Sequence, residues 1–188
     1  MRSPIACLVA LGALLAPLAW SSPSRADTSA WTFFGAGAVG WKQGDSDLVF
    51  DGALSFDIGV GTTPDAPIIV GGLLRATPIL DSGIDLALLA RVATRGFQAG
   101  PLGLALDVGG YQRFWGPGST GVAGALTLGG PLGISLSLQG SYGTDDAMAF
   151  GAVAGIDLLR LTVYRQSLLP LWPNPLPAQD RGRDVAWR

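Results

Sequence analysis

Large apolar side chains alternate with small or polar ones along much of the chain. From Leu48 to Val60 the even-numbered positions are apolar or glycine, whereas the odd-numbered positions are mostly small or acidic. The same even-apolar parity recurs over residues 84–93 and 132–139. Because successive side chains of a strand point to opposite faces, this period of two predicts β-strands with one large apolar face.

Turn-forming stretches rich in Gly, Pro and Asp divide the chain into eight such segments. The predicted strands are residues 31–43, 48–61, 68–80, 84–96, 101–115, 120–129, 132–143 and 147–165. Connections this short join neighbouring antiparallel strands. Most segments exceed the five or six residues usual in soluble strands and match the roughly 9 to 11 that cross a bilayer. The pattern therefore predicts an all-β fold, an eight-stranded antiparallel up-and-down transmembrane β-barrel.

The chain begins with the pattern of a secretory signal peptide over residues 1–26. An apolar stretch, interrupted by Pro17, follows Arg2 and leads to small residues at the end of Ser24-Arg25-Ala26. This pattern favours cleavage after Ala26 over a membrane-anchoring helix. We expect a barrel over residues 27–169 and a proline-rich, then charged, periplasmic tail over residues 170–188. The single cysteine, Cys7, would leave with the leader.

The charged residues narrow the possible chemistry. All 14 acidic residues are Asp, and the chain contains neither Glu nor His. Surfaces of soluble helical proteins are usually rich in Lys and Glu, so that class is disfavoured. Enzymes of comparable barrel architecture generally use a histidine, so we expect no catalysis and no cofactor. Loss of Arg2 and Arg25 with the leader would change the formal charge from −2 to −4, which disfavours nucleic-acid binding.

The two faces and the aromatic residues both favour a membrane barrel. Its lumen would take the small and polar odd positions, and lipid would contact the large even ones. Aromatic side chains are expected as girdles at the two rims. We expect Trp31, Phe33, Phe97 and Tyr164 at the periplasmic rim, and Trp41, Phe50, Phe114, Tyr142 and Phe150 at the outer rim.

With these features, residues 31–165 resemble the small eight-stranded outer-membrane barrels of Gram-negative bacteria, the group that contains the OmpA transmembrane domain and OmpX. The resemblance implies an outer-membrane location with both termini in the periplasm. It also implies contact with membrane lipid, lipopolysaccharide and the outer-membrane assembly machinery, and a monomeric barrel. Two features depart from the group. The outer turns here are shorter, and the tail follows the last strand, which ends near Tyr164 and Arg165 rather than on a terminal aromatic residue.

Charged residues at odd positions predict a charge network inside the barrel. Its expected members are Asp51, Asp57, Asp85, Asp107, Asp157, Arg75, Arg91, Arg95 and Arg113. If the fourth turn centres near Ala99, Arg91 lies opposite Asp107 and the two should pair. Isolated buried ions are costly, so the network should fill the lumen with ion pairs. The functional interpretation is a narrow ion path that opens when this network rearranges.

Two further motifs have both a chemical and a structural interpretation. Asp45, Asp47, Asp81, Asp145 and Asp146 fall in the predicted outer turns. Their carboxylates could bind divalent cations at the rim, although Asp also favours turns for conformational reasons. Residues 35–40 match the glycine pattern of dinucleotide-binding proteins, but no helix is predicted after them. Glycine in a tightly curved strand is the better interpretation.

Three functions remain open from the sequence. The first is a non-enzymatic outer-membrane barrel with a structural or surface-interaction role. The second is a narrow ion channel gated by the lumen network. The third is a soluble periplasmic lipocalin-like protein that binds a small apolar ligand, which requires the even positions to point inward. The final strand is irregular near Leu158–Leu161, where a β-bulge would keep Arg160 from facing lipid.

Overall fold

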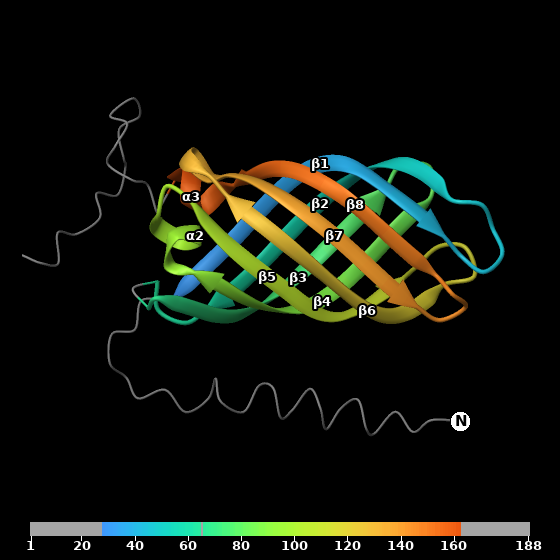
Figure 1. Ribbon diagram of the computed structural model, residues 1–188, viewed down its shortest axis with the longest axis horizontal. Helices are drawn as coiled ribbons and strands as arrows, with labels where there is room; N and C mark the ends of the chain where they lie inside the picture. Colours follow the sequence, from blue (N-terminus) through green and yellow to red (C-terminus); the bar gives the residue numbers. More distant parts are fainter. Residues whose placement is uncertain (1–27, 65, 163–188) are drawn as a thin grey trace, which may run out of the picture.

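The chain forms one closed antiparallel β-barrel in which each strand pairs with its sequence neighbour and β1 pairs with β8. The computed structural model describes residues 28–64 and 66–162, so the predicted signal peptide and tail lie outside the described residues. The strands are β1 (Ser29–Lys42), β2 (Val49–Gly61), β3 (Ile68–Ile79), β4 (Gly83–Thr94), β5 (Gly103–Arg113), β6 (Ser119–Gly129), β7 (Ile134–Gly143) and β8 (Met148–Asp157). The predicted all-β fold, an eight-stranded antiparallel up-and-down barrel, is confirmed (Figure 1).

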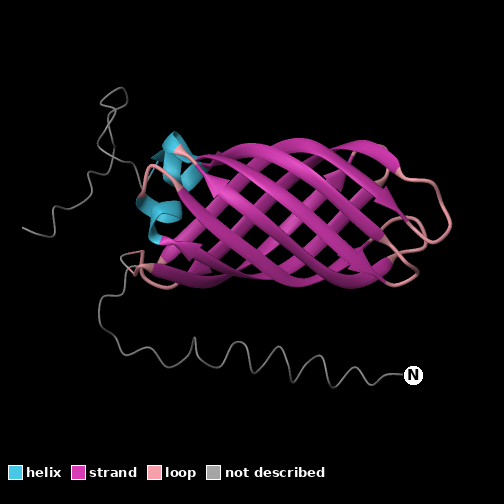
Figure 2. Ribbon diagram, viewed as in Figure 1, coloured by secondary structure: helices cyan, strands magenta, loops and turns pink. Residues whose placement is uncertain are grey.

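The two ends of the barrel differ in structure. One end carries only short turns between strands, at residues 43–48, 80–82, 114–118 and 144–147, and we call it the loop end (Figure 2). The other end carries two short α-helices and a 3₁₀ turn, and we call it the helix end. Its elements are α2 (Arg95–Ala99), η2 (Pro131–Gly133) and α3 (Leu158–Thr162).

The helix end departs from the predicted strand boundaries. Strand β8 stops at Asp157, and α3 replaces the predicted β-bulge near Leu158–Leu161, so that expectation was wrong. An Asp157 oxygen accepts the backbone N–H groups of Leu159 and Arg160, at 3.0 and 3.2 Å. A carboxylate that accepts the first free amides of a helix stabilises its start, so the chain turns into α3 directly after Asp157.

None of the helices in the described part of the chain has both the length and the apolar character needed to cross a membrane.

Glycine permits the tight curvature of the barrel. A methyl group at Gly37 would overlap the carbonyl oxygen of Ala152, and one at Gly109 would overlap that of Leu88. Neighbouring strands therefore approach too closely for any side chain at these positions. The glycine motif at residues 35–40 lies within β1 and leads into a turn, in agreement with the structural interpretation of that motif.

Candidate functional site: the barrel lumen

The odd-numbered and even-numbered strand residues correspond to the two faces of the barrel wall. Every strand pair aligns residues of equal parity, as in Arg91 with Asp107, so one face is even and the other odd throughout. Large apolar residues at even positions are exposed on the outside, such as Leu88 at 54% and Leu138 at 55%. Among the even positions of the described strands, only Lys42, at the last residue of β1, is charged. The orientation that a lipocalin-like interior requires is therefore absent from this barrel.

Four charged side chains in the middle of the lumen form a paired network. Arg75 donates to both oxygens of Asp57, at 2.8 and 2.6 Å, and to Asp107 at 2.9 Å. Arg91 donates to both oxygens of Asp107, at 2.7 and 2.8 Å. All four residues are at most 5% exposed. Two positive and two negative charges balance, and each arginine makes a two-pronged contact, which offsets the cost of removing the charges from water.

A second group of polar residues lies nearer the loop end. Arg113 pairs with Asp85 at 3.3 Å, and the indole N–H of Trp115 donates to Asp85 at 2.8 Å. Asp51 accepts the indole N–H of Trp41 at 2.8 Å and the Ser82 hydroxyl at 3.0 Å. Asp51, Asp85 and Arg113 thus lie inside the barrel as predicted, but in a cluster distinct from the central four residues.

Two predicted network members occupy the helix end instead of the strand lumen. Asp157 is buried at the end of β8 and starts α3. Arg95 is the first residue of α2 and is exposed, so its assignment to the lumen network was wrong. Odd-numbered strand residues face the lumen, but Arg95 does not, because β4 ends at Thr94. A helix does not keep the alternation of a strand.

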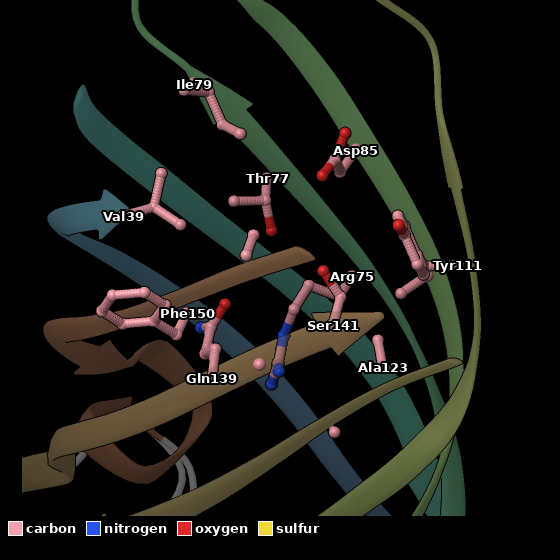
Figure 3. Close-up of a pocket in the computed structure, with 14 residues that line it drawn as sticks. Val39, Arg75, Thr77, Ile79, Asp85, Tyr111, Ala123, Gln139, Ser141 and Phe150 are labelled. Carbon is pink, nitrogen blue, oxygen red and sulfur yellow. The ribbon is translucent and has the colours of Figure 1, made fainter. Parts of the chain in front are cut away.

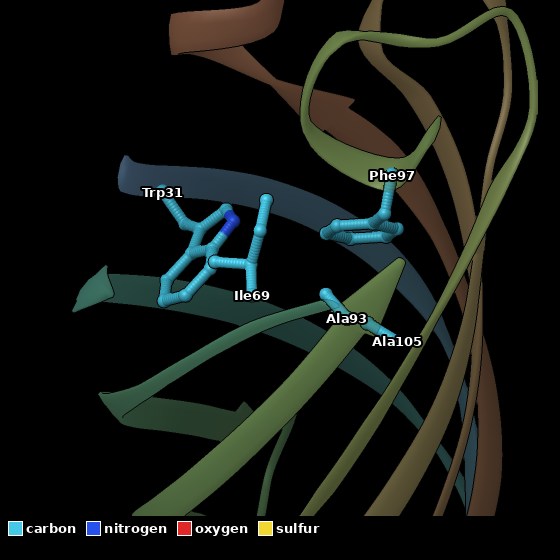
Figure 4. Packing of buried hydrophobic residues seen from close by; sticks show 5 residues of the cluster. All are labelled: Trp31, Ile69, Ala93, Phe97 and Ala105. Carbon is cyan, nitrogen blue, oxygen red and sulfur yellow. The ribbon is translucent and has the colours of Figure 1, made fainter. Parts of the chain in front are cut away.

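The helix end is closed by a plug that the sequence did not reveal. Its apolar cluster consists of Trp31, Ile69, Ala93, Phe97 and Ala105 (Figure 4). Arg160 donates to the carbonyl oxygens of Gly100 and Gly130, at 2.8 and 3.0 Å, and so ties three segments together. Burial lowers the pKa of the Arg160 guanidinium, and the charge of Asp157 opposes that shift. One of the two arginines of the central network, Arg91, contacts the same plug, because its guanidinium lies 5.1 Å from the ring of Trp31 and 5.3 Å from that of Phe97.

Of the two predicted girdles, the described residues form the one at the loop end, whereas those predicted for the other rim turn inward. Phe50, Phe114, Tyr142 and Phe150 are exposed on the outside near the loop end, as expected. Trp31, Phe33 and Phe97 are buried inside the helix end, and Trp41 turns into the loop end of the lumen, so their assignment to girdles was wrong. Tyr164 lies outside the described residues. The inward aromatics occupy odd positions, the same parity as the lumen charges.

Between the central network and the loop-end cluster lies a cavity of about 60 Å³ (Figure 3). Polar side chains around it include Thr77, Asp85, Tyr111, Gln139 and Ser141. Apolar residues such as Val39, Ile79 and Ala87 also line this cavity, which lies in the loop-end half of the lumen.

The five turn aspartates lie at the loop end, as the sequence predicted. Three of them, Asp81, Asp145 and Asp146, have positive φ angles of 64°, 56° and 49°. Asp tolerates this left-handed backbone better than most residues, which supports the conformational interpretation of these positions. Asp45 and Asp47 lie in the turn between β1 and β2. Within the described residues, no group of three or more potential ligands is arranged to hold a metal ion.

Comparison with known proteins adds no relative: no family model, curated protein or solved structure matches this chain.

Proposed function

We propose that the protein is a non-catalytic outer-membrane β-barrel of the small eight-stranded kind, with a structural or surface-interaction role in the cell envelope. The observation that carries this proposal is the outer wall. Its even-numbered strand residues are mostly apolar or glycine, with a few uncharged polar residues such as Thr94 and Gln112, and Lys42 at one rim is the only charged residue among them in the described strands. Lipid hydrocarbon can surround such a wall, because the wall carries almost no charged groups that would have to be removed from water.

The lumen supports a structural role over conduction. The paired network of Asp57, Asp107, Arg75 and Arg91 crosses the middle of the barrel, and the plug fills the helix end. Opening a path would separate buried charges from their partners, which costs several kcal/mol. The chain also contains no histidine, the usual general base of enzymes in related architectures.

In this proposal the helix end faces the periplasm and the loop end faces outward. Both ends of the described chain, Thr28 and Thr162, adjoin elements of the helix end, and this supports the proposed orientation. Membrane lipid, lipopolysaccharide and the outer-membrane assembly machinery are the partners of this placement, and the barrel acts as a monomer.

Fractionation of the native cell tests the proposal. The protein should require detergent for extraction, and its unboiled form should run faster than its boiled form on an SDS gel because a closed barrel resists SDS. Reconstituted into planar bilayers, it should give no discrete current steps. Recovery in the aqueous periplasmic fraction would overturn the membrane placement, and regular single-channel steps would overturn the structural role in favour of a channel.

A further inference from the structure

A groove of about 160 Å³ lies on the outer wall near the helix end, where β3, β4, β5 and β6 run side by side (Figure 1). Its walls are large even-numbered side chains, each about half exposed, namely Ile68, Val92, Leu104, Leu106 and Leu126. Ala93 and Ala105, which pair with each other, also border the groove and are buried members of the plug. The groove is therefore an apolar hollow of the wall that adjoins the plug.

The groove offers few hydrogen-bonding groups to an occupant. Thr94 supplies the polar side chain of its lining, and the Thr94 hydroxyl accepts the backbone N–H of Leu104 at 3.1 Å and donates to the Leu104 carbonyl oxygen at 3.4 Å. A peptide segment in an apolar groove would leave backbone N–H and C=O groups without partners, which is costly, whereas a hydrocarbon chain carries no such groups. The lining therefore favours an acyl chain over a protein segment.

Arg95 stands at the helix-end edge of this groove. It follows Thr94 directly, and its backbone N–H donates to the carbonyl oxygen of Pro67, the residue before Ile68, at 3.0 Å. Thr94 and Ile68 pair across β4 and β3, so Arg95 adjoins two residues of the lining. Its side chain is exposed. A guanidinium group forms charge-assisted hydrogen bonds with phosphate, so Arg95 can bind a lipid headgroup whose acyl chain lies in the groove.

The charges at the two ends of the barrel favour an anionic headgroup at this end. Among the described charged residues of the helix end, Arg95 is exposed, whereas Asp157 and Arg160 are 2% and 6% exposed. The loop end instead exposes five carboxylates, those of Asp45, Asp47, Asp81, Asp145 and Asp146. A negatively charged headgroup is therefore attracted to the edge of the groove and repelled from the opposite rim.

From these contacts we propose that the groove holds an acyl chain of an anionic phospholipid, and that the headgroup phosphate of this lipid binds Arg95. The inference rests on the membrane placement proposed above and adds to it a class of lipid and a position on the wall.

Quenching by brominated lipids tests the site at two positions of the wall. In a Cys7→Ser background, a bimane label at Leu128→Cys reports on the groove, because Leu128 is exposed and pairs with Leu104. The same label at Ile156→Cys lies on β8, outside the four strands of the groove, at a position that is also exposed. We call these the groove label and the far label.

The labelled barrels are reconstituted in vesicles of equal parts phosphatidylcholine, which is zwitterionic, and phosphatidylglycerol, which is anionic. Bromine is placed on the acyl chains of one lipid or of the other. The ratio of the two quenching efficiencies gives the local preference for the anionic lipid at each label.

Two pairs of variants separate the charge from the groove. Arg95→Gln removes the charge, and Arg95→Lys keeps it. Leu126→Phe places a larger ring in the groove, whereas Leu74→Phe makes the same change at an exposed position of β3 that does not line the groove. The heat-dependent shift on SDS gels checks that each variant still forms a closed barrel.

We expect the groove label to report a preference of roughly fivefold for phosphatidylglycerol, which is the contribution of one arginine near a membrane surface. The far label should report no preference. Arg95→Gln and Leu126→Phe should each bring the preference at the groove label close to one, and Arg95→Lys and Leu74→Phe should retain it.

Equal preferences at the two labels, or a preference that persists in Arg95→Gln, would overturn the site and leave the membrane placement intact. A preference unaffected by Leu126→Phe would overturn the groove as the place of the acyl chain, and its loss in Arg95→Lys would overturn the role of the charge. Absence of quenching at both labels with either brominated lipid would overturn the membrane placement, and the site with it.

Discussion

Asp107 is the carboxylate on which the central network depends, because it accepts hydrogen bonds from both Arg75 and Arg91. Asp107→Asn keeps its size but leaves two buried guanidinium groups with one carboxylate, Asp57. Removing one partner of a buried ion pair typically costs about 3–5 kcal/mol, and we expect a loss of that size in the free energy of unfolding. Urea titration in lipid vesicles, followed by tryptophan fluorescence, measures it.

The matched control is Asp81→Asn. Asp81 lies in an exposed turn with positive φ, which Asn also tolerates, so its effect should stay within about 0.5 kcal/mol. Equal unfolding curves for the two variants would show that the network does not hold the lumen together.

Adjacent glycines on β5 provide a second test. Gly109 faces inward, where a methyl group would overlap the Leu88 carbonyl, whereas a methyl group at Gly110 would lie 3.7 Å from that of Gly121. Gly109→Ala should destabilise the barrel by about 1–3 kcal/mol or prevent folding, and Gly110→Ala should have little effect. The yield of heat-shifting protein after refolding distinguishes them, and equal yields would contradict the close strand approach.

The alternation of odd and even positions explains which inward side chains were predicted from the sequence and which were missed. The turn near Ala99 placed Arg91 opposite Asp107, and the structure confirms that register. Trp31 and Phe33 lie in β1 and share the odd parity of the lumen charges, so the alternation itself could have placed them inside. Phe97 lies in α2, where the strand alternation no longer applies. All three were assigned to a girdle because aromatic residues near strand ends usually mark a membrane interface. Tertiary packing of the plug overrides that tendency.

At the scale of elements, the strands were predictable and the helices were not. The strands carry a long alternation of side chains, whereas α2 and α3 have only five residues each, too few to show a helical period. Arg160 would have faced lipid in a continued strand, and this conflict was the one sequence signal that β8 had to end. The chain avoids this conflict by ending β8 at Asp157 and starting α3, not by forming a β-bulge.

Arg160→Ala tests the role of α3 in the plug. The variant loses charged hydrogen bonds to Gly100 and Gly130, and we expect a loss of about 1.5–3 kcal/mol in the free energy of unfolding. Leu158→Ala, an exposed position of the same helix, should change stability far less. Native-state hydrogen exchange should show faster opening of α2 and α3 in Arg160→Ala alone. Unchanged exchange would mean that α3 does not hold the plug.

For the whole molecule, the proposal requires the outer wall to face hydrocarbon. Leu88 lies outward in the middle of β4, and Leu102 is also exposed, in the turn before β5. In lipid vesicles Leu88→Arg should destabilise the barrel by about 2–4 kcal/mol, and Leu102→Arg by about 0–1 kcal/mol, because the cost of a charge depends on its depth in the bilayer. Equal costs from urea titration would contradict a transmembrane orientation.

The most direct test of the membrane placement measures the surroundings of the wall residue by residue. Spin labels on single cysteines at positions 136, 138 and 139 of β7, in a Cys7→Ser background in lipid vesicles, report collisions with oxygen, which concentrates in lipid, and with a water-soluble nickel complex. Leu136 and Leu138 point outward, at 48% and 55% exposure, while Gln139 borders the cavity. We expect high oxygen and low nickel accessibility at positions 136 and 138, and low oxygen accessibility at 139. High nickel accessibility at positions 136 and 138 would mean that water, not lipid, surrounds the barrel.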